Sequence, residues 1–166
     1  MRLGVLTEPE GENRVAIVPN SVKKLVKKGL EVLVQSGAGN MSNYSDSEYE
    51  SAGASVVERE SVLSSELIIS IRMPQISELR SGLNLVCVAD PFRHPEIIKS
   101  CISSNVNLFS MDMIPRRLSR AQSMDVNSSQ DNLAGYKAVL LGASYVPRGI
   151  PMMTTSAGTV KPAKVV

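Results

Sequence analysis

The chain has 166 residues, of which 43% are hydrophobic, and its 18 basic and 16 acidic side chains give a formal net charge of +2. This length suits one domain, or one domain and the start of another, and a chain this apolar is not intrinsically disordered. The nearly balanced charge excludes the strong positive field that binds a phosphate backbone, so nucleic acid is not an expected partner. The sequence has no run of about 18 apolar residues, and we expect no segment that spans a membrane.

Six short apolar runs predict strands. In chain order they are RLGVLT (2–7), EVLVQS (31–36), SVVE (55–58), LIISIR (67–72), NLVCVA (84–89) and NLFSM (107–111). Several are apolar almost throughout instead of alternating, which is typical of strands covered on both faces of a sheet. The first run begins directly after Met1, so we expect no signal or transit peptide.

A helix is predicted between the first two runs, in NSVKKLVKKG. Asn20 or Ser21 is the expected cap, and Gly29 is the expected end. The spacing predicts one apolar stripe and one solvated face, formed respectively by Val22, Leu25 and Val26 and by Lys23, Lys24, Lys27 and Lys28.

A second helix is predicted in HPEIIKSCISSN. Pro95 suits the first helical position, and Glu96 favours the positive end of the helix dipole. The expected buried side consists of Ile97, Ile98, Cys101 and Ile102.

Strands and helices in alternation predict an α/β fold with a doubly wound, mostly parallel sheet and helices on both faces, a Rossmann-like or flavodoxin-like lobe. Cys87 and Cys101 lie in apolar surroundings without metal-ligand spacing. We expect both to be buried free thiols, which fits a reducing compartment.

The last third of the chain has a different pattern. From Asn132 the run LAGYKAVLLGASYV predicts a longer helix, and the segment 146–162, rich in proline and glycine, predicts a linker or crossing segment. The final residues AKVV (163–166) read as the start of a strand. A strand without a partner is not a natural end, so we expect the chain to be cut at that point.

Few side chains suit acid–base or metal chemistry. His94 is the single histidine and precedes Pro95, where a cap or loop role is expected, and two separate cysteines give no metal site. The SGAGNMS segment lacks the G-x-G-x-x-G spacing and predicts a plain strand-to-helix turn. For Arg14, after the first strand, two readings remain open: a solvated loop arginine, or a contact to a ligand carboxylate or phosphate.

The run RAQSMDVNSS (120–129) gathers polar side chains just before the long helix. Hydride transfer between two nicotinamides needs no acid, base, nucleophile or metal from the protein, because the cofactors carry the chemistry and the protein supplies placement. A polar loop held by a helix suits that task. A helix-capping loop without ligand is the equal alternative.

The run PRRLSRAQSMDVNSSQDNLAGYKAV closely resembles a loop and helix of the proton-translocating NAD(P) transhydrogenase family, in its NAD(H)-binding component or alpha subunit. The resemblance extends through TEPEGENRVAIVPNSVKKL, GAGNMSNYSDSEYESAGASVV and MMTTSAGTVKPAKVV. It implies a first lobe at 1–138, shared with alanine dehydrogenases, and at 139–166 a crossover with the first strand of a second, Rossmann lobe. The chain ends before that lobe's glycine fingerprint.

The resemblance also implies the site. Gln122 would position the nicotinamide and its ribose without breaking bonds, and the other expected NAD(H) contacts are Arg117, Ser123, Met124, Asp125 and Ser128. PRRLS has one residue more than the family's spacing, so Arg116 and Arg117 compete for one role.

The same resemblance implies partners and a location. NADP(H) would lie on a partner component, beside a membrane-spanning component that couples hydride transfer to proton movement. A homodimer is expected for the complete protein. The implied location is cytoplasmic, peripheral to the inner membrane, or on the matrix side in an organelle.

Two alternatives remain. Alanine dehydrogenase shares the fold, but Arg72 and Asp90 stand where its pattern has a lysine and a histidine, and His94 comes four residues too late. The other alternative is a binding or vestigial lobe that carries out no chemistry alone, since neutral hydrogen bonds from one lobe hold a dinucleotide weakly.

Overall fold

A computed structural model describes residues 1–164 of the chain. Its tertiary contacts separate into two compact units, Met1–Met124 and Asp125–Val166. Each unit is described by itself.

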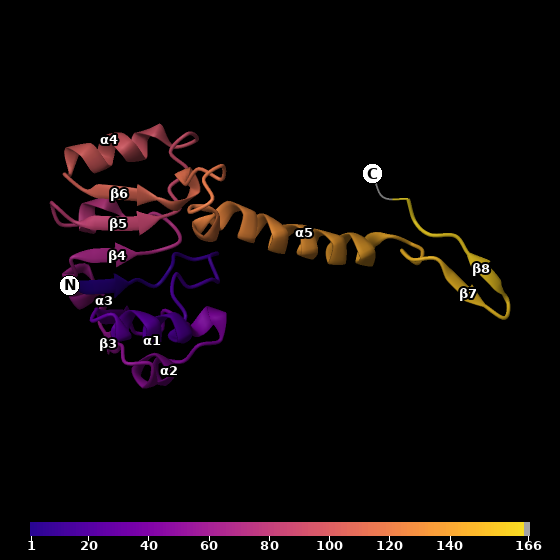
Figure 1. Cartoon of the computed structure of the whole chain (residues 1–166), viewed down its shortest axis with the longest axis horizontal. Helices are drawn as coiled ribbons and strands as arrows, with labels where there is room; N and C mark the ends of the chain where they lie inside the picture. The colour runs from indigo at the N-terminus through magenta and orange to yellow at the C-terminus, as the bar shows by residue number, and fades with distance from the viewer. Residues whose placement is uncertain (165–166) are drawn as a thin grey trace. The chain divides into compact units, whose positions relative to one another are not determined.

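The first unit is built on a six-stranded sheet with the order β3-β2-β1-β4-β5-β6, in which all neighbouring strands are parallel (Figure 1). The strands are β1 Arg2–Val5, β2 Glu31–Gln35, β3 Ser55–Val57, β4 Leu67–Ile69, β5 Asn84–Cys87 and β6 Asn107–Ser110. Each lies within one of the six predicted runs. The chain builds outward from β1 through β2 to β3, then returns to the other side of β1 for β4, β5 and β6. The expected doubly wound fold is therefore confirmed, and its switch point lies between β1 and β4.

Helices lie on both faces of this sheet. They are α1 Pro19–Lys27, α2 Asp46–Ser51, α3 Arg59–Leu63 and α4 Pro95–Ser103, with short 3-10 turns η1 Asn40–Ser42, η2 Ile76–Glu78, η3 Met111–Met113 and η4 Gln122–Met124. One core cluster joins α1 and α2 to the sheet through residues such as Val5, Val22, Val34 and Tyr49. The other joins α3 and α4 to the opposite face through Val62, Ile68, Leu85 and Cys101.

Helix α1 corrects one prediction and confirms others. It begins at Pro19 with Val18 as cap residue and no side-chain cap, so neither Asn20 nor Ser21 has the expected role. A proline at the first position has no N–H that needs an acceptor and presets a helical φ, which makes a side-chain cap less necessary. The helix ends before Gly29, whose φ of 84° confirms the predicted stop. The apolar stripe faces the core and the four lysines face solvent, as predicted.

Helix α4 begins at Pro95 as expected, but its apolar residues are divided. Cys101 is buried and Ile97 is half-buried, whereas 36% of Ile98 and 75% of Ile102 are exposed, so the prediction that all four face inward is wrong. The helix packs against β6, the edge strand, so only one side of it meets the sheet. Both cysteines are buried free thiols, as predicted.

The second unit contains one long helix and a hairpin. Helix α5, Val126–Tyr145, begins before the expected start at Asn132. The antiparallel strands β7 Met153–Thr155 and β8 Gly158–Val160 lie where a linker was predicted. The predicted final strand is not formed at 163–164, and its last two residues lie outside the described residues. Among residues 1–164, no helix is both long and apolar enough to cross a membrane.

Candidate functional site

The predicted ligand loop is a series of tight turns after β6. Backbone N–H groups of Ala121 and Gln122 donate to the Leu118 carbonyl, at 2.8 and 3.2 Å, and that of Met124 donates to the Ala121 carbonyl at 2.9 Å. Ala121 is buried and anchors the turn. The backbone of the turn is therefore held by the first unit itself.

The side chains of this turn point to solvent. Arg117, Gln122, Ser123 and Met124 are all exposed. Ser123 makes only a long contact, 3.5 Å from its Oγ to the carbonyl of Arg120. Arg116 already interacts with the protein. By contrast, the side chains of Arg117 and Gln122 make no hydrogen bond or ion pair to any residue in the described range.

Asp125 and Ser128 bind one another at the start of α5. The Asp125 carboxylate accepts the Ser128 backbone N–H at 3.0 Å and the Ser128 hydroxyl at 2.6 Å. This is an N-cap, and it satisfies one of the helix's unpaired N–H donors. The capping reading of the polar run is therefore correct for this pair. The cap also explains why α5 begins before Asn132.

A second group of polar side chains lies at the switch point, beyond the carboxyl ends of β1 and β4. A cavity of about 290 Å³ opens there, lined by Leu6, Thr7, Glu8, Pro9, Gln35, Arg59, Ser70, Arg72, Met73, Pro74 and Gln75. The Glu8 carboxylate accepts the backbone N–H groups of Ile71 and Arg72 at 2.6 and 2.8 Å. Burial raises the pKa of Glu8, against the opposing effect of these two hydrogen bonds.

Arg14, for which the sequence leaves two interpretations, is hydrogen-bonded to Glu12. The Glu12 carboxylate accepts Arg14 Nε at 2.7 Å and Nη2 at 2.6 Å, and Arg72 Nε at 3.1 Å. Only 8% of the Glu12 side chain is exposed. The hydrogen bond from Arg14 lowers the pKa of Glu12 to about 2. The guanidinium of Arg14 is therefore engaged by an internal carboxylate, a partner that neither of the two sequence-based interpretations included.

Ser70 is the least satisfied polar group of this cavity. Its residue is 6% exposed, and its Oγ has no hydrogen-bond partner among the described residues. Arg59, on the same wall, donates to Gln35 Oε1 at 3.3 Å and to Glu78 at 2.6 Å. Buried hydroxyls are normally paired with protein or water, so Ser70 marks the part of the cavity that accepts a polar atom.

Other candidate residues serve local structure. His94 precedes α4, and its Nδ1 lies 3.1 Å from Glu96 Oε1, which agrees with the expected cap or loop role. Asp90 has a φ of 45° and donates its backbone N–H to Asp112 at 3.1 Å. Among residues 1–164 there is no cluster of three or more histidine, cysteine, aspartate or glutamate side chains suited to a metal.

The glycine segment after β2 is a plain turn, as predicted. The Gly37 N–H donates to the Asp46 carboxylate at 2.9 Å, so this donor is used within the protein. A Cβ on Gly39 would lie 2.6 Å from the Tyr44 carbonyl oxygen and from the ring of Tyr49. Close packing therefore explains this glycine without a phosphate.

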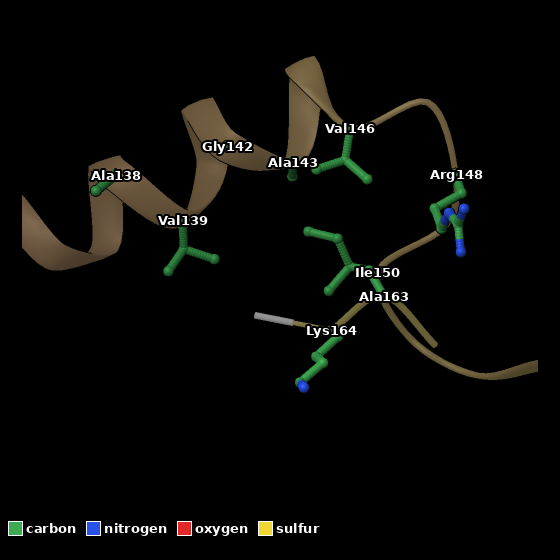
Figure 2. A pocket seen from close by; sticks show the side chains of 9 residues that line it. All are labelled: Ala138, Val139, Gly142, Ala143, Val146, Arg148, Ile150, Ala163 and Lys164. Atoms are coloured by element: carbon green, nitrogen blue, oxygen red, sulfur yellow. The ribbon is translucent and has the colours of Figure 1, made fainter. Parts of the chain in front are cut away.

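The second unit has a hollow of its own, with a volume of about 700 Å³ (Figure 2). It is lined by Ala138, Val139, Gly142, Ala143, Val146, Arg148, Ile150, Ala163 and Lys164. The wall opposite α5 is held by the Ala163 N–H, which donates to the Ile150 carbonyl at 3.0 Å. In Figure 2, Val139, Val146 and Ile150 reach into this space. Exposed apolar side chains of this kind are typical of a surface that packs against another surface.

The fold and the switch-point cavity define the class: a doubly wound α/β domain, in which ligands bind beyond the carboxyl ends of the strands. Residues 4–134 match the family model "Alanine dehydrogenase/PNT, N-terminal domain", and the chain belongs to this family.

Three similar proteins place the chain within this family. It is 38% identical over 165 residues to the first part of NAD(P) transhydrogenase subunit alpha of Rhodospirillum rubrum, covering 93% of this chain and 43% of the relative. The crystal structure of transhydrogenase from Sinorhizobium meliloti has 41% identity and a TM-score of 0.90, over 98% of this chain and 50% of that one. Alanine dehydrogenase of Bacillus subtilis is 29% identical over 156 residues, covering 90% of this chain and 40% of the relative. The chain thus spans about half the length of the proteins that it matches.

Proposed function

We propose that this chain is the nicotinamide-orienting lobe of the NAD(H)-binding component of a proton-translocating NAD(P) transhydrogenase. The proposed reaction is hydride transfer between NADH and NADP+, coupled to proton movement across a membrane. Support comes from the relative in Rhodospirillum rubrum and the structure from Sinorhizobium meliloti, both transhydrogenases by name. Sequence identity of 38–41% across nearly the whole chain favours this function over others in the same family.

One observation carries the residue assignment: the turn before α5 has a fixed backbone and exposed polar side chains. Gln122 is held through its N–H on Leu118, while its carboxamide faces solvent. A side chain so placed can bond a ribose hydroxyl and a nicotinamide without first breaking an internal contact. In this proposal Gln122 is a positioning residue, and the bound nucleotides supply the hydride chemistry.

The other proposed contact residues differ in whether they already interact with another residue of the protein. Arg117 is exposed and is preferred over Arg116, which already interacts with the protein. Asp125 and Ser128 are bonded to one another, so their part is to fix the end of the turn, with further contact to NAD(H) through their remaining hydrogen-bonding capacity. Ser123 and Met124 line the same turn.

The proposed partners follow from the same relatives. An NADP(H)-binding component would hold the second nucleotide, and a membrane-spanning component would carry the protons. We propose a homodimer for the complete assembly, located on the cytoplasmic face of the inner membrane or its matrix equivalent. The lobe at 1–138 would contribute the turn, and 139–166 would lead into the second nucleotide-binding lobe.

The test uses this chain extended with the remaining portion of the Rhodospirillum rubrum relative and mixed with an NADP(H)-binding component. NADH-dependent reduction of an NADP+ analogue is measured for Gln122→Asn and for Ser119→Ala, an exposed control in the same turn. We expect Gln122→Asn to slow the transfer by about 10²-fold, the cost of misplacing reacting atoms by about 1 Å, with NADH affinity nearly unchanged. An equal loss of rate and affinity would reduce Gln122 to a binding contact.

Alanine dehydrogenase activity is the second candidate, since the family includes those enzymes. Arg72 stands where the alanine dehydrogenase pattern has a lysine, and its Nε donates a hydrogen bond to Glu12 at 3.1 Å. Asp90 stands in place of the histidine, and its backbone N–H is tied to Asp112. The extended chain should therefore give no pyruvate- and ammonia-dependent NADH oxidation. Turnover there, with none toward NADP+ analogues, would reverse the assignment; inactivity in both assays would favour a vestigial lobe.

A further inference from the structure

The switch-point cavity contains a carboxylate without a charged partner. Burial raises the pKa of Glu8, and the backbone N–H groups of Ile71 and Arg72 are the donors that hold its two oxygens. Among residues 1–164, no side chain forms an ion pair with Glu8. A carboxylate has about four acceptor positions, so each oxygen can accept a further hydrogen bond. Glu8 therefore has unused acceptor capacity, and its ionised form lacks a counter-ion inside the protein.

The guanidinium groups near this cavity are bound to other carboxylates. Arg59 donates to Glu78 at 2.6 Å. Arg14 and Arg72 both donate to Glu12, at 2.6 and 3.1 Å. Because these positive groups are already engaged within the protein, the cavity offers a ligand hydrogen-bond acceptors more than cations.

The Ser70 hydroxyl supplies a second acceptor on the wall that follows β4. The residue is 6% exposed, and no atom in the described part of the chain bonds its Oγ. Ser70 directly precedes Ile71, whose N–H binds Glu8 at 2.6 Å, so the hydroxyl and the carboxylate belong to the same end of the cavity. An unpaired buried hydroxyl is destabilising. A donor that reached it would gain a hydrogen bond without breaking one of the protein's own.

The remaining wall is partly apolar. Leu6 is buried, and Met73 and Pro74 are half-buried where they line the cavity. The volume of about 290 Å³ lies at the lower end of the ~300–1,000 Å³ that ligand pockets occupy. The cavity therefore suits a small molecule that has hydrogen-bond donors at one end and a short carbon chain at the other.

We propose that the switch-point cavity binds a small primary alkylammonium ion, with its ammonium group between the Glu8 carboxylate and the Ser70 hydroxyl and its carbon chain on the apolar wall. An ammonium group has three donors and no acceptor, which matches a site that offers acceptors. Its hydrogen bond to a carboxylate is of the strong, charge-assisted kind. No residue of the turn before α5 lines this cavity, so the proposal goes beyond the proposed function and does not depend on it.

Other kinds of ligand match the cavity less well. An anion would be repelled by Glu8, and Arg59 and Arg72 would have to leave their carboxylate partners to bind it. A neutral alcohol could pair with Ser70 but would leave the charge of Glu8 without a counter-ion. A divalent metal needs about six oxygen ligands, and residues 1–164 contain no cluster of three or more acidic, histidine or cysteine side chains.

The test is a titration of the ¹⁵N-labelled 166-residue chain with n-propylammonium chloride at constant ionic strength, followed by NMR. The reporters are the backbone N–H signals of Ile71 and Arg72, which bond to Glu8. Sodium propionate and n-propanol match the probe in size, with the opposite charge and with none. We expect a saturable shift with a dissociation constant on the order of 1 mM for a ligand of about four heavy atoms. Propionate and propanol should bind at least about tenfold more weakly.

Two variants locate the site. Ser70→Ala should weaken propylammonium binding by at least about tenfold, the loss of one hydrogen bond to a charged group. It should leave the Tm of the free chain unchanged or higher, because the hydroxyl has no partner in the described residues. Glu8→Gln should abolish binding. The exposed residues Ser77 and Glu10 give the controls Ser77→Ala and Glu10→Gln, which should bind as the parent chain does.

Several results would overturn the proposal. The absence of a saturable shift would mean that the cavity does not take the ion. Equal or tighter binding of propionate would identify an anion site, and equal binding of propanol would identify a neutral polar site. Unchanged affinity in Ser70→Ala would exclude the hydroxyl from the site. This last comparison stands even where Glu8→Gln does not fold.

Discussion

Substitution of Glu12 by glutamine removes the charge that joins the loop after β1 to the loop after β4. Glu12 accepts two hydrogen bonds from Arg14 and one from Arg72, with 8% of its side chain exposed. Glutamine keeps the size and one acceptor, so the substitution tests the charge and not the packing. We expect Glu12→Gln to lower the free energy of unfolding at neutral pH.

The magnitude follows from the pKa of Glu12, which falls from 4.5 to about 2 because Arg14 donates to the carboxylate. Each pKa unit corresponds to about 1.4 kcal/mol, which sets an upper bound of about 3.4 kcal/mol. The side chains of Arg14 and Arg72 are 45% and 58% exposed, and solvent weakens their attraction. We therefore expect a loss of about 2 kcal/mol.

The pH dependence has a definite sign. The folded-state pKa of Glu12 is lowered, so its contribution is complete above about pH 4.5 and is lost as the pH falls through about 2. Urea unfolding followed by circular dichroism is measured for the parent chain, for Glu12→Gln and for Glu10→Gln, an exposed control in the same loop. The difference between parent and Glu12→Gln should shrink to less than half between about pH 7 and about pH 3. A difference that does not change with pH would refute the electrostatic explanation.

Three further predictions concern the core and the ligand. Tyr49→Phe removes a hydroxyl that donates to the buried carbonyl of Ile17 at 2.8 Å, and should cost about 1–3 kcal/mol in urea unfolding, whereas Tyr44→Phe should cost less. Burial raises the pKa of Cys87 to about 12, so Cys87 and the equally buried Cys101 should react with a maleimide only after unfolding; rapid reaction of the native chain would contradict their burial. The 166-residue chain alone should bind NADH too weakly for calorimetry, because one lobe offers few contacts against the entropy of association, and sub-micromolar affinity would disprove this.

The sequence predicts most accurately what depends on local pattern. All six strands lie within apolar runs visible in the sequence, because strands buried on both faces must be apolar almost throughout. The stop at Gly29 and the start at Pro95 are also predictable, since each depends on the backbone of one residue.

The failures depend on partners distant in the sequence. Ile98 and Ile102 face outward because α4 packs against the edge strand. The order of strands in the sheet cannot be predicted from the spacing of apolar residues within one helix. The role of Glu12 is not predictable from its neighbours because it requires Arg72, sixty residues away along the chain. The hairpin at 153–160 resembles a linker in sequence because its two strands are short and the second begins with Gly158. The start of α5 has a visible signal in Asp125, three residues before Ser128, but the apolar pattern begins only later and points to Asn132.

The two hydrogen bonds that Glu8 accepts from the backbone N–H groups of Ile71 and Arg72 affect the order in which the protein folds. The Glu8 carboxylate can form these hydrogen bonds only after Ile71 and Arg72 have been synthesised, more than sixty residues later in the chain. Contacts of such long sequence separation form late, after the loops between them have closed. The switch-point cavity therefore forms only once β4 has been synthesised and has paired with β1.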